Sequence, residues 1–324
     1  MHIVITGAAG FLGSKLAREL LSKGVLTGPT GGPEKITQIT LLDVVKPAGF
    51  SDPRIKVVTG DIADRATVAA ALTSDVQGIF HLAAVVSGQA EADFDLGMKV
   101  NLDATRQILD RARALATQPR LVFTSSVAVF GGDLPAVVPD AMSPVPQSSY
   151  GAQKAMCELL VNDFSRKAFI DGRVVRLPTV SVRPGAPNKA ASSFASGIIR
   201  EPLNGQSAVC PVNGDTRMWL MSPRKVVHNL IHAYELDGAR FGASRIVSLP
   251  GLSVTVRDMV GALKTVAGAE VAQRIQWLED ESIKRIVTSW PGDFQAVLGK
   301  ALGFKADTDF AGIIRAYIED EHLS

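Results

Sequence analysis

The sequence contains little cysteine and no excess of either charge. Only Cys157 and Cys210 occur in 324 residues, which excludes a disulfide-stapled fold and favours a reducing compartment. Lysine and arginine number 34 against 32 acidic residues, so the formal net charge of +2 indicates no basic surface for nucleic acid or a membrane. The five histidines form no cluster with cysteines or carboxylates at metal-ligand spacing, so we expect no metal site.

Long hydrophobic runs are also missing, because glycine or a charged residue interrupts each one, and nothing is expected to span a bilayer. Residues 1–7 carry neither a basic segment nor a cleavage site, so we expect no signal peptide. What the chain does have is 46% hydrophobic residues and 29 glycines, enough for a sizeable core. We therefore expect a cytoplasmic protein with a small-molecule partner.

Short β-branched segments alternate with helical patterns through the first half of the chain. Near-continuous apolar strands separated by helices are typical of a parallel sheet covered on both faces. With right-handed crossovers, this pattern predicts an α/β fold with a Rossmann-type doubly wound sheet. The expected strands are 3–6, 39–43, 55–58, 78–82, 120–124 and 173–177, and the main expected helices lie around 64–73, 94–115 and 150–169.

A glycine-rich turn follows the first expected strand and opens the first expected helix. Gly7, Gly10 and Gly13 form a G-x-x-G-x-x-G pattern. Glycines there permit a tight turn and close approach of a pyrophosphate, which the free N–H groups of a helix N-terminus bind. A purely structural turn also uses glycine, but its position at the start of a βαβ series favours nucleotide binding.

Asp43 ends the second expected strand, where a carboxylate accepts both ribose hydroxyls of NAD and repels a 2′-phosphate. No arginine follows it directly, so NAD is favoured over NADP; the alternative is an aspartate that caps a turn. Residues 27–34, expected as a surface loop, lengthen the distance between the glycines and Asp43.

The next two strands also end in residues suited to a cofactor. Asp61 and Ile62 follow the third strand, where a carboxylate can bond the adenine amino group. Leu82, Ala83 and Ala84 follow the fourth and leave room for a cofactor over the sheet edge. His81, on an apolar strand, is expected to be a hydrogen-bonded core residue.

After residue 183 the regular alternation of apolar strands and helices gives way to a mixture of short helices and strands. We expect residues 1–183 plus about 222–248 to form the NAD-binding Rossmann domain. Residues of about 184–221 plus 249–324 would then form a smaller, discontinuous substrate-binding lobe. The reason for the split is that a helix and a strand within 222–248 are expected to return to the main sheet.

Tyr150 and Lys154 lie four residues apart in an expected helix and therefore on one face. A phenol with a pKa of about 10 needs a drop of about 3 units, roughly 4 kcal/mol, to work near pH 7. One cation at about 4 Å in an effective dielectric near 20 supplies about that much. Desolvation opposes this effect, so a second cation would help, and an oxidised nicotinamide ring provides one. Ser126, at the end of the fifth strand, can bond the reacting oxygen. The alternative is a helix start with a solvated lysine.

In this order the motifs resemble those of extended short-chain dehydrogenases/reductases, in the NAD-dependent epimerase/dehydratase group. The resemblance covers nearly the whole chain. It implies that Ser126 binds substrate, that Tyr150 is the acid/base, and that Lys154 lowers the tyrosine pKa and holds the nicotinamide ribose. The cofactor contacts it implies are Gly7, Gly10, Phe11, Leu12, Gly13, Asp43, Asp61, Ile62, Leu82, Ala83, Ala84, Asn101, Tyr150, Lys154 and Leu177.

Departures from the family pattern narrow the chemistry. Val127 and Ala128 stand where sugar dehydratases carry Asp-Glu, which disfavours dehydration. Thr179 and the run from Arg217 to Trp219 differ from nucleotide-sugar enzymes, which puts a nucleotide-diphosphate substrate in doubt. Three stretches are instead similar to family members that oxidise a four-carbon sugar acid at its 2-hydroxyl. A nucleotide-sugar 4-epimerase and a non-enzymatic redox sensor remain alternatives, although sensors tend to lose the Tyr/Lys pair.

The smaller lobe is expected to hold the carboxylate of a sugar acid through Arg217, with Lys189 as a second candidate. The expected substrate contacts are Ser87, Ser125, Ser126, Tyr150, Thr179, Asn188, Ser193 and Arg217. The resemblance also implies a homodimer formed by helices 94–115 and 150–169, which carry more apolar positions than one core stripe needs. The candidates for the extra face are Ala112, Leu115, Met156, Leu160 and Phe164.

Overall fold

A parallel sheet forms the centre of the larger lobe in the computed structural model, which describes residues 1–29, 31–186 and 190–323. Within these ranges seven strands pair in the order β12-β8-β7-β6-β1-β4-β5, and every pairing is parallel. The expected Rossmann-type doubly wound sheet is therefore confirmed. The strands are β1 (His2–Thr6), β4 (Gln38–Asp43), β5 (Ile55–Thr59), β6 (Val76–His81), β7 (Arg120–Ser126), β8 (Asp171–Leu177) and β12 (Ile246–Ser248).

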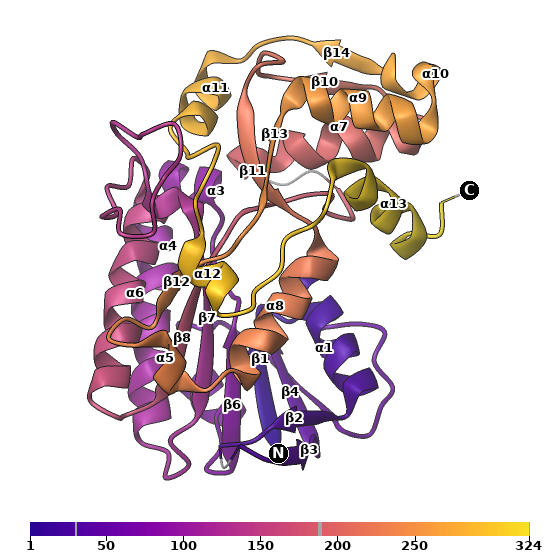
Figure 1. Cartoon of the computed structure of the whole chain (residues 1–324). Helices are drawn as coiled ribbons and strands as arrows, with labels where there is room; N and C mark the ends of the chain where they lie inside the picture. The colour runs from indigo at the N-terminus through magenta and orange to yellow at the C-terminus, as the bar shows by residue number, and fades with distance from the viewer. Residues whose placement is uncertain (30, 187–189, 324) are drawn as a thin grey trace.

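Helices cover both faces of this sheet (Figure 1). Successive side chains of a strand point to opposite faces. Ile5 accordingly packs with Leu16 on one side, and Val4 packs with Ile108 and Val161 on the other. Burial on both faces explains why the strands contain continuous apolar runs. One face is covered by α1 (Phe11–Lys23) and α8 (Pro223–Glu235), and the other by α2 (Arg65–Ala71), α5 (Ala104–Arg113) and α6 (Ser149–Arg166).

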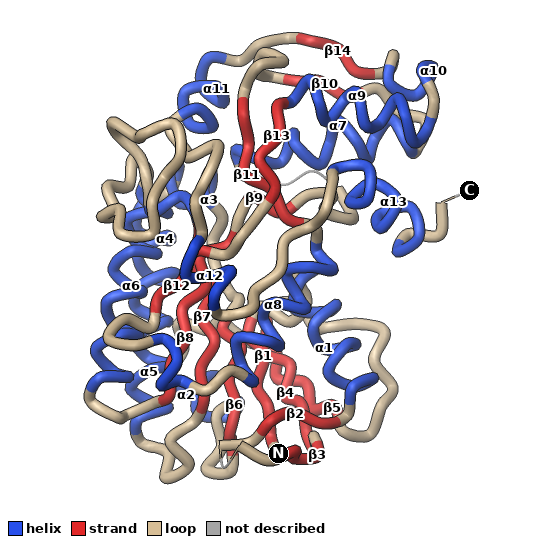
Figure 2. Tube along the Cα trace, viewed as in Figure 1, coloured by secondary structure: helices blue, strands red, loops and turns tan. Residues whose placement is uncertain are grey.

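The smaller lobe lies above the carboxyl ends of the strands and has its own apolar core (Figure 2). A three-stranded sheet in the order β13-β11-β9 and the parallel pair β10-β14 support it. Its strands are β9 (Thr179–Val180), β10 (Ala208–Cys210), β11 (Arg217–Met221), β13 (Leu252–Thr255) and β14 (Ile275–Trp277). Its helices are η3 (Ala191–Ser193), α7 (Phe194–Leu203), α9 (Val256–Ala267), α10 (Ala269–Ala272), α11 (Glu281–Thr288) and α13 (Phe310–Asp320).

The chain crosses between the lobes several times. Helix α8 and strand β12 lie with the large sheet, as the proposed division of the chain requires. After α12 (Val297–Ala301), Leu302 and Phe304 also pack into the core of the larger lobe. This last return cannot be predicted from the sequence, because it places two apolar side chains against residues far away in the chain.

The loop expected at residues 27–34 is wrong in part. Strands β2 (Val25–Thr27) and β3 (Pro33–Lys35) pair antiparallel, and the turn is closed by a bond from the Gly28 N–H to the Gly32 carbonyl at 2.8 Å. Glycine-rich turns permit such tight hairpins. The segment therefore adds a small hairpin ahead of β4 without disturbing the position of Asp43 at its end.

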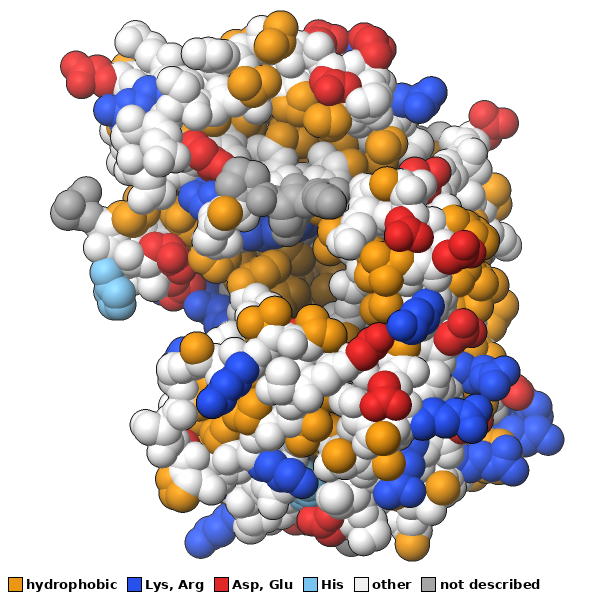
Figure 3. Space-filling view, turned by 180° about the vertical axis from the view of Figure 1, so that it is seen from behind, with side chains coloured by type: hydrophobic (Ala, Val, Ile, Leu, Met, Phe, Trp, Pro, Cys, Tyr) orange, Lys and Arg blue, Asp and Glu red, His pale blue; other side chains and the backbone are white. Residues whose placement is uncertain are grey.

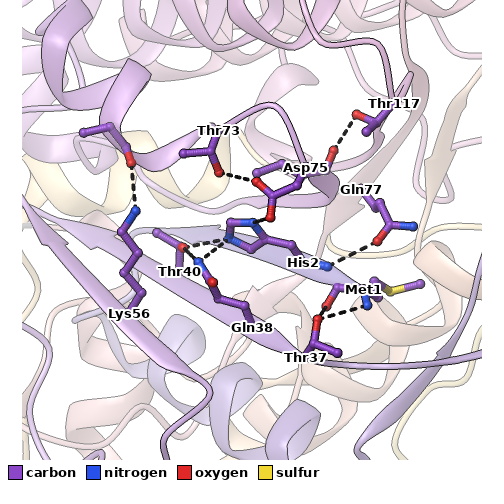
Figure 4. A network of polar contacts seen from close by, with 12 residues as sticks. Met1, His2, Thr37, Gln38, Thr40, Lys56, Thr73, Asp75, Gln77 and Thr117 are labelled. Atoms are coloured by element: carbon purple, nitrogen blue, oxygen red, sulfur yellow. Dashed lines mark hydrogen bonds and ion pairs between the residues drawn. The ribbon is translucent and has the colours of Figure 1, made fainter.

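A polar network fastens the sheet at the amino-terminal end of β1, away from the smaller lobe (Figure 4). The two ring nitrogens of His2 contact Asp75 at 3.0 Å and Thr40 at 2.8 Å. Burial lowers the pKa of His2 below its ordinary value. The neutral ring donates to Asp75 and accepts the amide of Gln38, which ties β1 to its neighbours.

The remaining short elements are α3 (Ser87–Ala92), α4 (Phe94–Gly97), η1 (Met98–Asp103), η2 (Val127–Val129) and η4 (Gly238–Phe241). Both cysteines are buried and free. No helix within the described residues combines the length and the apolar composition needed to span a membrane.

Candidate active site

Two adjoining cavities lie at the carboxyl ends of the sheet strands, where ligands bind in doubly wound folds. The large cavity, of about 600 Å³, is bordered by the ends of β1, β4 and β6. The small cavity, of about 200 Å³, lies between the end of β7, the start of α6 and the smaller lobe. Figure 3 shows the surface hollowed between the two lobes. The cavities share the lining residues Phe11, Leu12, Leu82, Ala84, Val86 and Thr124.

The glycine turn shapes the large cavity as a dinucleotide requires. Gly7 has a φ of 70°, and a Cβ atom there would lie 2.8 Å from the Ala83 nitrogen. A Cβ at Gly13 would clash with the Gly7 carbonyl oxygen, so helix α1 packs closely on β1 only because Gly13 has no side chain. The glycine turn and the first turn of α1 therefore line the cavity together, which fits a pyrophosphate.

Two carboxylates of the large cavity are held by backbone N–H groups. Asp43 accepts the N–H of Ala9 at 2.9 Å, which ties the end of β4 to the glycine turn. Asp61 accepts the N–H of Ala63 at 2.9 Å and pairs with Lys99 at 3.0 Å. Both side chains line the cavity, so their remaining lone pairs can accept hydroxyl or amino groups of a nucleotide.

Most of the predicted cofactor contacts lie on this surface. The large cavity is lined by Gly7, Gly10, Phe11, Leu12, Gly13, Asp43, Asp61, Ile62, Leu82, Ala83 and Ala84, and the small one by Tyr150, Lys154 and Leu177. Asn101 does not line either cavity. Its buried amide accepts from the N–H of Val85 at 2.8 Å and donates to the Val85 carbonyl at 3.1 Å. Asn101 therefore holds Val85, which lines the large cavity, in place.

The structure brings Ser126, Tyr150 and Lys154 together in the small cavity. Ser148 caps helix α6 by accepting the N–H of Gly151, which places Tyr150 in the first turn. The Ser126 hydroxyl lies near the Tyr150 phenol and acts to lower its pKa. Lys154 is 2% exposed, and its ammonium donates to the Thr124 carbonyl at 2.9 Å. The ammonium nitrogen lies 5.6 Å from the centre of the tyrosine ring.

Burial controls the protonation of these groups. It raises the pKa of the Tyr150 phenol to about 12, against the opposing effects of the Arg183 charge and the Ser126 hydrogen bond. Burial also lowers the pKa of the Lys154 ammonium to about 8. In the protein alone, desolvation of the phenol therefore outweighs the opposing positive charge, which agrees with the expected need for a second cation.

A buried ion pair between Glu158 and Arg176 stabilises the elements that carry the site. Glu158 is 1% exposed and receives bonds from Arg176 at 2.8 and 2.6 Å and from the Ser125 hydroxyl at 2.6 Å. Ser125 is therefore committed to a carboxylate. The pair joins α6 to the carboxyl ends of β7 and β8, so it fixes the distance between Tyr150 and the strand that carries Ser126.

The predicted substrate contacts divide into three groups. Ser87, Ser125, Ser126, Tyr150 and Thr179 line the small cavity. Ser193 and Arg217 do not, and Asn188, like Lys189, lies outside the described residues. The structure places the exposed Arg217 on β11, where its guanidinium lies 3.3 Å from the Ser253 hydroxyl and away from the small cavity.

Sequence reasoning missed Arg183 and Trp290, which line the small cavity, whereas Ser192, whose hydroxyl was expected to face the substrate, does line it. Arg183 is half-buried and donates to the Val180 carbonyl at 2.9 Å and to the Ser192 hydroxyl at 3.0 Å. The sequence marks Arg183 only as the last residue before a Pro-Gly turn. Its side chain reaches the cavity together with Ser192 of η3, to whose hydroxyl it donates.

His81 is a core residue, as expected. Its ring nitrogens contact Thr6 at 2.7 Å and Thr105 at 2.9 Å beneath the floor of the large cavity. Burial lowers the pKa of His81 to about 3. The imidazole therefore stays neutral and positions the strand ends.

Comparison with known proteins connects this geometry to a family. Residues 3–238 match the NAD dependent epimerase/dehydratase family. A D-erythronate dehydrogenase from Cupriavidus necator is 56% identical over 324 residues, covering 100% of both chains. A D-erythronate dehydrogenase from Haemophilus influenzae is 47% identical over 320 residues, covering 98% of this chain and 99% of that protein.

Solved structures agree on the fold. A protein from Agrobacterium tumefaciens described as a nucleoside-diphosphate-sugar epimerase has a TM-score of 0.93 and 44% identity, covering 100% of this chain and 95% of that one. An L-threonine dehydrogenase from Cupriavidus necator has a TM-score of 0.86 at 21% identity over 99% of this chain and all of its own, a likeness of fold alone.

Proposed function

The chain belongs to the NAD dependent epimerase/dehydratase family, and from this premise we propose that it oxidises the 2-hydroxyl of a small sugar acid, D-erythronate or a close analogue, to the 2-oxo acid, with NAD as the hydride acceptor. One observation carries the proposal. Ser126, Tyr150 and Lys154 lie in one cavity that adjoins a dinucleotide-shaped cavity, in a chain matched over its full length by two dehydrogenases of that acid.

The residues of the small cavity divide the reaction between them. Ser126 donates a hydrogen bond to the 2-hydroxyl oxygen and stabilises the negative charge that develops on this oxygen. The Tyr150 oxygen, as phenolate, takes the hydroxyl proton while C2 loses its hydrogen as hydride and the C–O single bond becomes a carbonyl. When bound, NAD supplies the hydride acceptor and a positively charged ring. Lys154, held by the Thr124 carbonyl, adds the fixed positive charge that favours the phenolate.

The preference for NAD over NADP rests on Asp43. Its carboxylate lines the large cavity at the end of β4 and is already oriented by the Ala9 N–H. Two neutral hydroxyls of a ribose satisfy the remaining oxygen lone pairs, whereas a 2′-phosphate brings like charges together. Among the described residues, no arginine or lysine lines the large cavity to offset that repulsion.

A nucleotide-sugar 4-epimerase is the second candidate, since one solved structure of the fold is described as such an epimerase. The size of the small cavity argues against it. About 200 Å³ lies below the roughly 300–1,000 Å³ typical of pockets for larger ligands, and a nucleoside diphosphate adds to the sugar. A sensor that only binds a dinucleotide would leave the three reacting side chains without a purpose.

Incubation with NAD and candidate substrates distinguishes the dehydrogenase, the epimerase and the sensor. Net oxidation of D-erythronate accumulates NADH, which its absorbance reports. An epimerase returns the hydride to the sugar, so nucleotide sugars would be converted with no net NADH. A sensor would bind NAD and convert neither compound. NADH formation with sugar acids supports the proposal, and either of the other outcomes replaces it.

A homodimer formed through α6 is part of the same proposal. Met156, one of the residues expected at the interface, is 37% exposed on this helix, and Leu159, which was not among those residues, is 68% exposed. Ala112 and Leu115, also expected at the interface, are instead buried in the core of the larger lobe, so that part of the expectation is wrong. Covering the exposed α6 side chains with the same face of a second copy removes apolar surface from water. Sedimentation at micromolar concentration gives a dimer under this proposal and a monomer otherwise. A cytoplasmic location stays a prediction.

A further inference from the structure

We propose that Arg183 binds the carboxylate of the substrate and thereby selects acids over neutral polyols. The proposal rests on the proposed function for the identity of the substrate. The observations that support it are the charges and contacts of the small cavity. These observations do not depend on whether the protein oxidises the substrate.

The small cavity is positively charged. Among the described residues that line it, only Arg183 and Lys154 carry a charge, and none of these residues is acidic. Lys154 donates to the Thr124 carbonyl. Within the described part of the chain, the guanidinium of Arg183 is therefore the charged group of this cavity that is left to attract an anion. A neutral polyol would leave this charge partly desolvated and without a counter-ion, at a cost in binding.

Arg183 differs in its partners from the four fully buried arginines. Arg120, Arg173, Arg176 and Arg200 each lie within 4 Å of a carboxylate. Across the described ranges no carboxylate pairs with Arg183. Its two hydrogen bonds go to the neutral oxygens of Val180 and Ser192. A guanidinium has five N–H donors in a fork that matches a carboxylate, so donors remain for a ligand.

The backbone of Arg183 is also fixed. Its N–H donates to the Ser196 hydroxyl at 3.0 Å, and its carbonyl accepts from Arg200 at 2.9 Å. Together with the bonds of the side chain, these contacts hold the guanidinium in one orientation before a ligand arrives. Such preorganisation lowers the entropy cost of binding.

The chemistry of a 2-hydroxy acid requires the anchor to be close to the reacting groups. The carboxylate carbon is bonded directly to C2, whose hydroxyl must reach Tyr150 and Ser126. Arg183 meets this requirement, because it lines the same cavity and its charge acts on the Tyr150 phenol. Arg217, exposed on β11, is outside the cavity and cannot hold a group one bond from C2.

The test compares arginine variants in the full-length protein. Arg183→Met should lower kcat/KM for D-erythronate with NAD at least about a hundredfold, mainly through KM, because it removes a charged partner from a desolvated site. Arg183→Lys, which keeps the charge but loses the fork, should recover part of that loss. NAD affinity, followed by the quenching of protein fluorescence, should stay within about threefold of the wild type, which also shows that the variants fold.

Arg257→Met is the matched control. Arg257 is also in the smaller lobe but pairs with Asp215 in solvent, where an ion pair contributes little, so activity should be unchanged. A kcat/KM within threefold of the wild type for both Arg183→Met and Arg183→Lys would overturn the proposal. A large loss in Arg217→Met, with Arg183→Met near normal, would assign the anchor to Arg217.

A binding measurement separates this proposal from the proposed function. Calorimetry of D-erythronate and of neutral erythritol, each added to the protein saturated with NADH, needs no turnover. Binding of the acid alone, weakened at least tenfold by Arg183→Met, supports the anchor even if the wild type forms no NADH from D-erythronate. Equal binding of the acid by the wild type and Arg183→Met, or equal binding of the polyol by the wild type, overturns the anchor even if oxidation is observed.

Discussion

Breaking the Glu158–Arg176 pair should be among the most damaging single changes in the larger lobe. Both side chains are almost fully buried, at 1% and 8% exposure, and two N–H groups of Arg176 meet the carboxylate at 2.8 and 2.6 Å. Glu158→Gln leaves the guanidinium without a counter-ion in a desolvated place, which costs about 3–5 kcal/mol. This is a large part of a total stability of about 5–15 kcal/mol. It also weakens the acceptor of the Ser125 hydroxyl.

Urea unfolding followed by tryptophan fluorescence measures this cost. Asp163→Asn is the matched control, because Asp163 pairs with Arg166 on the same helix but at 58% and 64% exposure. That change should cost less than about 1 kcal/mol. The double variant Glu158→Leu, Arg176→Met should recover most of the loss, since it removes both charges together. Equal losses in Glu158→Gln and Asp163→Asn would show that the buried pair is worth no more than a surface pair.

Further predictions concern protons and the cofactor. Tyr150→Phe should reduce kcat at least about a hundredfold while NAD affinity stays within about threefold, because only the hydroxyl moves a proton; a rate near that of the wild type would exclude Tyr150 as the acid/base. Asp43→Ser should raise the kcat/KM ratio of NADP to NAD at least about tenfold, and an unchanged ratio would leave Asp43 as a turn residue. His81, with a pKa of about 3 in the fold against 6.5 unfolded, stabilises the protein above pH 6.5. This contribution falls as the pH decreases, by about 2 kcal/mol at pH 5. Urea midpoints at pH 7 and pH 5 measure the fall, and His81→Gln should reduce it; an equal fall in both proteins would contradict the assignment.

The parts of the site that the sequence predicts are those that follow from local chain order. Gly7 follows an apolar strand and Asp43 and Ser126 each end one, and parallel strands bring such positions to one edge of the sheet. Tyr150 and Lys154 share a helix face because four residues complete about one turn. These relations need no knowledge of how distant segments pack.

The parts that it does not predict depend on distant segments. Arg183 and Arg217 are both arginines of the second half with apolar neighbours, and only the path of the chain after β9 decides which one enters the small cavity. Ala112 and Leu115 show the same limit, since a helix pattern with excess apolar residues does not distinguish burial within one chain from burial between two. The pKa of Tyr150 also depends on burial, which spacing along the helix does not report.

The most direct test of the central claim follows the hydrogen that leaves the substrate. D-erythronate carrying deuterium at C2 is incubated with the protein and NAD, and the reduced cofactor is analysed by mass spectrometry. The proposed reaction predicts one deuterium in each molecule of NADH formed, together with a 2-oxo acid as the product. NADH without deuterium, or no NADH while D-erythronate binds, would contradict oxidation at the 2-hydroxyl.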